Sequence, residues 1–157
     1  TSDRKYALSK IDFKQLPKTS TVIKKGKGER TLAIFSDPNC PYCKMIEKEL
    51  AQLDNVTIRL YPYPILSPES KTMSVSVLCS SKPGETWKSW MLNAVNIPTQ
   101  SCKKGEDQVS TNLAFGKKYS ITATPTLFFE NGDRVTGALQ ANKINEIFEL
   151  VKNSKNK

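Results

Sequence analysis

A Cys-x-x-Cys motif, formed by Cys40 and Cys43, lies where a short apolar run meets a helical pattern, and this junction constrains the fold most. Residues 31–36 are mostly apolar and predict a buried strand. Residues 45–53 place apolar side chains at helical spacing, and residues 56–61 alternate as a second strand. A strand, a helix and a strand in succession predict a parallel strand pair, because parallel neighbours need a crossover connection.

The remaining chain extends this unit into one α/β domain. Its 157 residues suffice for a single hydrophobic core. Residues 69–119 contain helical patterns, residues 126–136 form a predicted hairpin around Asn-Gly, and residues 144–151 predict a closing helix. We therefore predict the order β-α-β, helical insertion, β-β-α. Residues 1–18 are interpreted as a linker or N-terminal arm, and residues 19–157 as the domain.

The helix after the motif carries three local signals. Asn39 is a favourable N-cap, so we expect the helix to begin there. Glu47 and Glu49 alternate with lysines, a pattern typical of an exposed helix face. Asn55 is expected to end the helix before the second strand begins.

Composition excludes several classes of function. The chain contains no histidine, which removes histidine-based acid–base catalysis and most catalytic zinc sites. The net charge is +9, but +6 of it lies in residues 1–30 and +2 in residues 143–157, so we predict solvated ends and no nucleic-acid partner. The longest uncharged stretch, residues 89–102, is too short and too polar to span a bilayer. Because the chain begins at Thr1 without an apolar leader, we expect a processed chain or a part of a longer one.

The motif cysteines carry the predicted chemistry. Residues three apart lie on one helix face, which brings the Cys40 and Cys43 thiols within disulfide range. Of the four cysteines, only Cys40 is expected at a helix N-terminus, where unpaired N–H groups and the helix dipole favour the thiolate. The thiolate is the attacking species in disulfide exchange. Cys43, almost one turn further along, would be shielded and would resolve the mixed disulfide formed at Cys40.

Other roles for the cysteines are weaker. A purely structural disulfide within Cys-x-x-Cys would close an unusually short loop. Structural zinc takes four ligands, and Cys79 and Cys102 do not form a second Cys-x-x-Cys pair, so we predict no metal and no cofactor. These two cysteines could instead remain buried free thiols, or pair and close a 24-residue loop worth roughly 3 kcal/mol, which requires an oxidising compartment. Pairing is favoured because it leaves no odd cysteine.

Three further features each allow two interpretations. Asp37 could exchange a proton with the neighbouring thiol or, as we prefer, act as a turn residue. Tyr42, Tyr61 and Tyr63 could flank a substrate groove, or pack in the core or at its rim. The Thr124–Pro125 bond, directly before the predicted hairpin, could be an ordinary trans bond or a cis bond with a structural purpose.

Residues 35–44 (FSDPNCPYCK) resemble the active-site segment of the bacterial periplasmic disulfide isomerases, the DsbC/DsbG family. Residues 61–66 (YPYPIL), the two separate cysteines and Thr124-Pro125 are also similar to that family. The order of these features resembles the family's thioredoxin-like catalytic domain, over residues 21–151. Pro41 departs from the Cys-Gly-Tyr-Cys motif frequent in these isomerases and resembles the DsbG branch and glutaredoxins.

The resemblance implies a thioredoxin-like fold in which Cys40 is the nucleophile and Cys43 the resolving thiol. It implies that Pro125 is cis and lies against this pair, with Thr124 before it. We assign substrate binding to Thr124, Pro125 and Tyr42.

The resemblance also implies a structural disulfide between Cys79 and Cys102 and a membrane-bound thiol reductant that keeps the active cysteines reduced. Members of the family dimerise through an N-terminal domain. Only 39 residues precede Cys40, so we expect a dimer only if the full-length protein carries such a domain.

These features predict a thiol–disulfide oxidoreductase of the bacterial periplasm that reduces or isomerises misoxidised secreted proteins. A glutaredoxin-like reductase would share Cys-Pro-Tyr-Cys, but the long insertion and the second cysteine pair argue against it. The rival from another class is a peptide-binding chaperone module with incidental cysteines. Such a module would keep its activity in Cys40→Ala, whereas an oxidoreductase would lose it.

Overall fold

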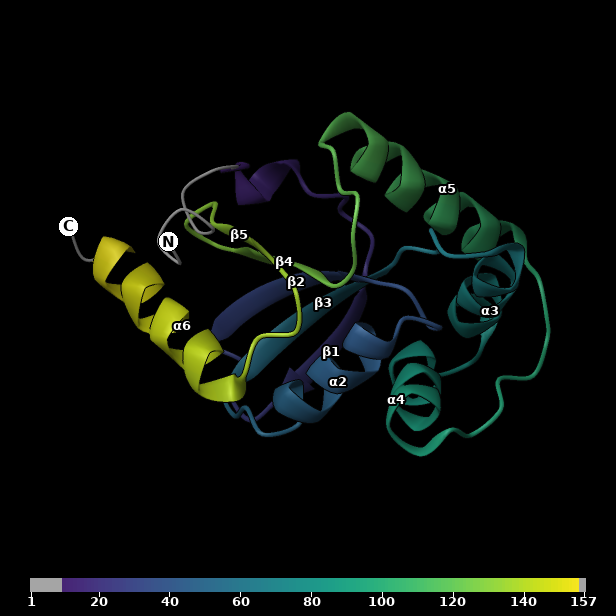
Figure 1. Cartoon of the computed structure of the whole chain (residues 1–157), viewed down its shortest axis with the longest axis horizontal. Coiled ribbons are helices and arrows are strands. Elements are labelled where there is room, and N and C mark those ends of the chain that lie inside the picture. The colour runs from purple at the N-terminus through teal and green to yellow at the C-terminus, as the bar shows by residue number, and fades with distance from the viewer. Residues whose placement is uncertain (1–9, 156–157) are drawn as a thin grey trace.

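The computed structural model describes residues 10–155, and its centre is a five-stranded mixed sheet (Figure 1). In the order β1-β3-β2-β4-β5, β2 and β3 are parallel and the other neighbours are antiparallel. The predicted parallel pair is therefore present. The strands are β1 (Thr21–Lys25), β2 (Arg30–Ser36), β3 (Val56–Pro62), β4 (Thr126–Phe129) and β5 (Arg134–Thr136).

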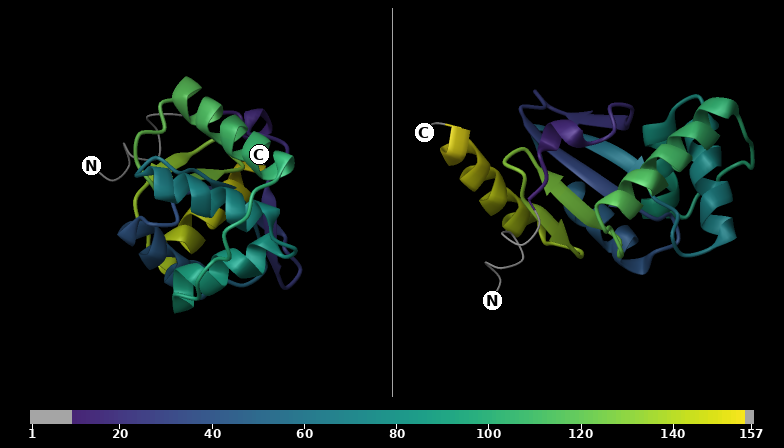
Figure 2. Two further views of the ribbon diagram at one scale, coloured as in Figure 1. Left: turned by 90° about the vertical axis from the view of Figure 1, so that its right-hand side faces the viewer. Right: turned by 90° about the horizontal axis from the view of Figure 1, so that it is seen from above.

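Helices cover both faces of this sheet and gather at one end of it (Figure 1 and Figure 2). They are α2 (Pro41–Leu50), α3 (Pro68–Cys79), α4 (Pro83–Asn93), α5 (Lys103–Lys118) and α6 (Ala141–Lys155), with a 3-10 helix η1 at Phe13–Gln15. Helices α3, α4 and α5 lie between β3 and β4 in the chain and are packed together beyond one end of the strands. Within the described residues, no helix is both long enough and apolar enough to cross a membrane.

The N-terminal arm predicted for residues 1–18 is only partly visible, because residues 1–9 lie outside the described residues. From Ile11 onward the segment is attached to the domain: the Ile11 N–H donates to the Gly132 carbonyl at 3.1 Å, and Leu16 is buried. This part of the predicted arm therefore packs on the β4–β5 hairpin.

Two apolar cores, one on each face, hold the sheet in place. Leu32 and Ile34 of β2 face α2, α4 and α6, whereas Phe35 faces α5 and the N-terminal segment. Phe35 stacks on Tyr61 and on Phe115, with ring centroids 4.7 Å and 5.4 Å away. Because both faces are buried, β2 has the nearly continuous apolar sequence of an interior strand. The residues at its carboxyl end are therefore held by packing from both sides.

Two predictions for α2 are wrong. The N-cap is Cys40 and not Asn39, because Cys40 still has an extended backbone and Pro41 begins the helix. Glu47 was expected on the exposed face but is only 6% exposed. It follows Cys43 by four residues, so it shares the face of α2 that packs into the core. Lys48, the next residue in sequence, lies on another face of the helix and is exposed.

The predicted end of α2 also needs correction. The helix stops at Leu50, and the chain turns before Asn55. Asn55 has a φ of 51°, a left-handed conformation that Asn tolerates better than most residues. Its side-chain oxygen accepts a hydrogen bond from the Glu29 N–H at 2.9 Å. Asn55 therefore belongs to the turn that leads into β3.

Candidate active site

The Cys-x-x-Cys motif lies at the junction of β2 and α2. The Cys40 carbonyl accepts hydrogen bonds from the N–H groups of Cys43 and Lys44, both at 3.1 Å, so the motif forms the first turn of the helix. Both thiols are free, and the exposed fractions of Cys40 and Cys43 are 5% and 0%. Cys40 is therefore the member of the pair that solvent reaches.

A segment more than 80 residues further along the chain reaches both sulfur atoms. The Cys40 thiol lies 3.4 Å from the Thr124 carbonyl oxygen and can donate to it. The Thr124 hydroxyl is within hydrogen-bonding reach of the Cys43 sulfur. The Thr124–Pro125 peptide bond is cis. The structure thus brings Cys40, Cys43, Thr124 and Pro125 into one place.

Hydrogen-bond donors surround the Cys43 sulfur. The Asp37 N–H points at it from 3.4 Å, and the hydroxyls of Ser36 and Thr124 lie near it. Burial nevertheless raises the pKa of Cys43 to about 12, because the loss of solvent outweighs these donors and the neighbouring Cys40 thiol opposes ionisation as well. Cys43 is therefore a neutral thiol near neutral pH, in agreement with its predicted shielding.

The carboxylate of Asp37 fastens the loop before the motif. One of its oxygens accepts from the Asn39 N–H and the Ser70 hydroxyl, both at 2.8 Å, and the other accepts from the Leu66 N–H at 3.0 Å. The contact to Asn39, two residues further on, is an Asx turn. The preferred interpretation of Asp37 as a turn residue is confirmed, and its two oxygens join the loop to Leu66 and Ser70.

Two tryptophans of α4 hold the active-site segment from the insertion. The Trp90 indole donates to the Pro38 carbonyl at 2.7 Å. The Lys44 ammonium lies 4.7 Å from the centre of the Trp90 ring. The Trp87 indole donates to the Glu47 carboxylate at 3.4 Å. Burial raises the pKa of Glu47 to about 7, against the lowering effect of the indole N–H. Sequence reasoning missed these contacts, although two tryptophans in one short helix were the available signal.

Residues 17–152 match the family model of a thioredoxin-like domain. The chain belongs to the thioredoxin-like domain family. The predicted thioredoxin-like α/β fold is thereby confirmed. Among curated proteins, the chain is similar to a probable thiol:disulfide interchange protein DsbC of Bordetella pertussis, with 40% identity over 145 residues. This match covers 92% of the present chain and 51% of the relative, so it supports the predicted resemblance to the DsbC/DsbG family, and the chain spans about half the length of the curated relatives it matches.

Solved structures give the same result. A disulfide interchange protein of Neisseria gonorrhoeae superimposes with a TM-score of 0.77 at 27% identity, covering 83% of this chain and 93% of that one. The catalytic domain of Proteus mirabilis ScsC superimposes with a TM-score of 0.69 over 86% of this chain and 90% of that one. Its identity is 19%, so this second likeness concerns the fold alone.

Of the three tyrosines considered for a substrate groove in this thioredoxin-like domain, only one is at the surface. Tyr42 is 61% exposed on α2, next to the motif. Tyr61 and Tyr63 are buried in the core, where the Tyr63 hydroxyl donates to the Ile121 carbonyl at 2.8 Å. The packing interpretation therefore holds for Tyr61 and Tyr63.

The second cysteine pair lies in the insertion of the thioredoxin-like domain, away from the motif in the chain. Cys79, the last residue of α3, is bonded to Cys102, with the two Cα atoms 5.8 Å apart. Cys102 is the N-cap of α5, and its sulfur accepts from the Gly105 N–H at 3.3 Å. The expectation that only Cys40 would lie at a helix N-terminus is therefore wrong. The first turn of α5 contains only polar residues and glycine, so the apolar pattern did not indicate that this helix begins at Lys103.

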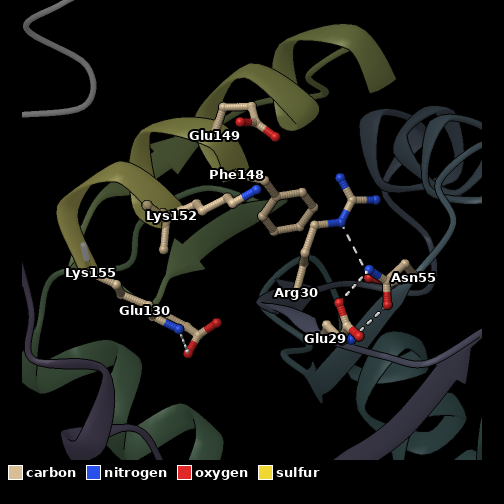
Figure 3. A pocket seen from close by; sticks show the side chains of 9 residues that line it. Glu29, Arg30, Asn55, Glu130, Phe148, Glu149, Lys152 and Lys155 are labelled. Carbon is tan, nitrogen blue, oxygen red and sulfur yellow. Dashed lines mark hydrogen bonds and ion pairs between the residues drawn. The ribbon is translucent and has the colours of Figure 1, made fainter.

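A pocket of about 420 Å³ lies at the opposite end of β2 from the motif (Figure 3). The Arg30 guanidinium there lies 4.8 Å from the centre of the Phe148 ring, and Lys155 pairs with Glu130 at 2.8 Å. Three acidic and three basic side chains line the pocket, so it presents no net charge that would select a ligand. Its remaining charged lining residues are Glu29, Glu149 and Lys152.

Proposed function

We propose that this thioredoxin-like domain exchanges disulfide bonds in secreted proteins, with Cys40 as the nucleophile and Cys43 as the resolving thiol. The observation that carries the proposal is the free pair at the start of α2, with Thr124 in contact with both sulfurs. The relatives named as thiol:disulfide interchange proteins support the same chemistry.

The first step is attack by Cys40. Its sulfur lies at the N-cap of α2, where the helix dipole stabilises a negative charge, and it is the more exposed of the two. The Cys40 thiolate attacks one sulfur of a client disulfide. A mixed disulfide forms between Cys40 and the client, and the second client sulfur leaves as a thiolate that takes a proton from water.

The second step has two outcomes. In reduction, Cys43 loses its proton to solvent and attacks the Cys40 sulfur, so a Cys40–Cys43 disulfide forms and the client is released as a thiol. Two electrons have then moved from the cysteine pair to the client. In isomerisation, another client thiolate attacks the mixed disulfide, a new client disulfide forms, and Cys40 leaves as the thiolate with no net change in oxidation state.

The same geometry supports a contact surface for clients. Tyr42 and Met45 are exposed on one face of α2, and the exposed Leu66 is attached to the active-site loop through Asp37. An extended client segment would lie across these side chains and beside Thr124 and Pro125, pairing through its main chain as an added strand. We assign client binding to Thr124, Pro125 and Tyr42 on this basis.

The cellular setting is part of the proposal. The bonded Cys79–Cys102 pair supports an oxidising compartment, for which we propose the bacterial periplasm. There a membrane-bound thiol reductant would return the motif cysteines to the reduced state. The family resemblance implies dimerisation only through a further N-terminal domain, and we propose no nucleic-acid partner.

The test uses a secretory protein with scrambled disulfides as the client. In Cys43→Ser the mixed disulfide cannot be resolved, so we expect the client to accumulate on Cys40, visible on a non-reducing gel and mapped by mass spectrometry. Cys40→Ser should trap nothing. Trapping on another cysteine would overturn the role assignment.

Two further assays separate the proposal from its rivals. A peptide-binding chaperone would prevent aggregation of a reduced client equally well in Cys40→Ser and in the parent protein. A glutaredoxin-like reductase would reduce glutathione mixed disulfides far faster than client protein disulfides. The three-helix insertion with its own disulfide supports exchange of client disulfides over the glutaredoxin-like alternative.

A further inference from the structure

The buried hydroxyl of Ser36 lacks an ordinary hydrogen-bond partner. Ser36 is the last residue of β2 and is completely buried. Within residues 10–155, its Oγ is one of two buried side-chain oxygens or nitrogens without such a partner, the other being that of Ser74. Burying an unpaired hydroxyl is costly, so a native protein that retains one calls for an explanation.

The position of Ser36 supplies that explanation. Side chains alternate along a strand, so Ser36 faces the same side of β2 as Leu32 and Ile34, the side against which α2 packs. The N–H of Asp37, the next residue, points at the Cys43 sulfur from 3.4 Å, so this sulfur is a polar group close to the Ser36 hydroxyl. A neutral thiol is a weak acceptor, whereas a thiolate is charged and accepts strongly. The hydroxyl therefore gains a good partner only when Cys43 loses its proton.

We infer that Ser36 stabilises the Cys43 thiolate during resolution of the mixed disulfide, an inference that rests on the proposed exchange function. In that step Cys43 gives its proton to solvent and its thiolate attacks the Cys40 sulfur. The Cys40–Cys43 bond forms, the bond from Cys40 to the client breaks, and the client leaves as a thiolate. Ser36 donates to the sulfur that carries the charge before the attack, together with the Asp37 N–H and the Thr124 hydroxyl.

This role matters because Cys43 is hard to ionise. An interaction made only in the reactive form accelerates a step, whereas one made equally in the resting form does not. Loss of one hydrogen bond to a charged group lowers the thiolate fraction by roughly 10-fold to 100-fold. The remaining thiolate is more basic and hence more nucleophilic, which cancels nearly half of that loss on a logarithmic scale. The net effect on resolution is about 3-fold to 10-fold.

The experiment separates the two steps with the small disulfide dithiobis(nitrobenzoate). Attack by Cys40 releases one coloured thiolate, and resolution by Cys43 releases a second. With the probe in excess, rapid mixing resolves two phases in the reduced full chain. Ser36→Ala should slow the second phase about 3-fold to 10-fold and leave the first unchanged. Ser74→Ala removes the other unpaired hydroxyl and should change neither phase.

A second pair of variants covers any loss of packing. Thr and Val have the same shape, so Ser36→Thr and Ser36→Val place equal volume at the end of β2, and only Thr keeps the hydroxyl. We expect Ser36→Thr to resolve faster than Ser36→Val. Equal second phases in these two variants, or equal slowing of both phases in Ser36→Ala, would overturn the role of Ser36. Absence of any release by the parent protein would instead overturn the proposed function.

Discussion

The two cysteine pairs of this domain carry the same chemical groups but are in different states. Cys79 and Cys102 are half-buried and bonded, whereas Cys40 and Cys43 are free and buried more deeply. Greater exposure therefore does not mark the pair for which we propose redox chemistry. A helix N-terminus does not distinguish it either, because Cys40 and Cys102 are both N-caps.

The surroundings of the two pairs do distinguish them. The insertion disulfide joins the end of α3 to the start of α5, and a Cβ on Gly105 would come within 2.5 Å of the Cys79 sulfur. The residues around Cys79 and Cys102 therefore pack closely against their disulfide. The sulfur of Cys43 instead faces donors from Ser36, Asp37 and Thr124. These donors would stabilise a negative charge on the Cys43 sulfur, which forms when a thiol takes part in disulfide exchange.

The first prediction is that exchange depends on Cys40 and not on the insertion disulfide. Cys40→Ser replaces the attacking sulfur with a hydroxyl that ionises far less readily, so disulfide exchange should fall to the uncatalysed rate. The paired change Cys79→Ser and Cys102→Ser should leave exchange close to the parent rate, because neither residue contacts the motif sulfurs in the described structure. Turnover of a scrambled client measures both. Strong loss of turnover in the double variant would mean that the insertion pair takes part in the chemistry.

The second prediction is that the insertion disulfide, and not the motif pair, contributes to the free energy of unfolding. Removing Cys79–Cys102 should lower the free energy of unfolding by roughly 3 kcal/mol, because the unfolded chain gains the freedom of a loop closed across 23 positions. Cys40→Ser should change this free energy little in the reduced protein. Urea unfolding under mildly reducing conditions measures the difference. Equal stability of the double variant and the parent would remove the structural role of the disulfide.

The fold follows from periodicity and turn chemistry, which is why it could be predicted. The β-α-β unit around the motif and the hairpin at Asn131 and Gly132 depend on local patterns, and the structure contains both. Helix ends were less accurate. The N-cap is Cys40 and not the predicted Asn39, because Pro41 occupies the first helical position, where proline is favoured.

The shell around the site depends on contacts between distant segments and left little local signal. Glu47 looked exposed because Glu47 and Glu49 alternate with Lys44 and Lys48, but helix geometry places it on the face below Cys43. Ser36 looked like the polar end of an apolar strand. Only the packing of α2 against β2, with the Asp37 N–H directed at the Cys43 sulfur, places its hydroxyl near that sulfur.

The third prediction concerns the cost of charge beneath the active pair. Burial raises the pKa of Glu47 from 4.5 to about 7. Below about pH 4.5 both the folded and the unfolded chain carry a protonated Glu47, and its contribution to stability is complete. As the pH rises, the unfolded chain ionises first, so stability is lost until the folded group ionises near pH 7. Between pH 5 and pH 7 the loss is about 2 kcal/mol.

Glu47→Gln should remove this dependence, because an amide keeps an acceptor for Trp87 and cannot ionise. The variant should unfold at a nearly constant denaturant concentration from pH 5 to pH 7 as far as this group contributes, and should be the more stable protein at pH 7. Glu149→Gln, on the exposed face of α6, is the control and should retain the parent profile. Parallel profiles for parent and Glu47→Gln would contradict the assignment.

The last prediction tests whether α4 of the insertion also holds the loop that carries the motif cysteines. Trp90→Phe removes the indole N–H that donates to the Pro38 carbonyl at 2.7 Å and should cost about 1 kcal/mol. Tyr63→Phe removes one buried donor on the other face of the sheet at a similar cost and is the matched control. Alkylation of the buried Cys40 thiol requires local opening of its loop, so Trp90→Phe should speed labelling roughly 5-fold, whereas Tyr63→Phe should not. Equal acceleration in both variants would mean that labelling reports overall stability, and that α4 holds the loop no more firmly than the rest of the core does.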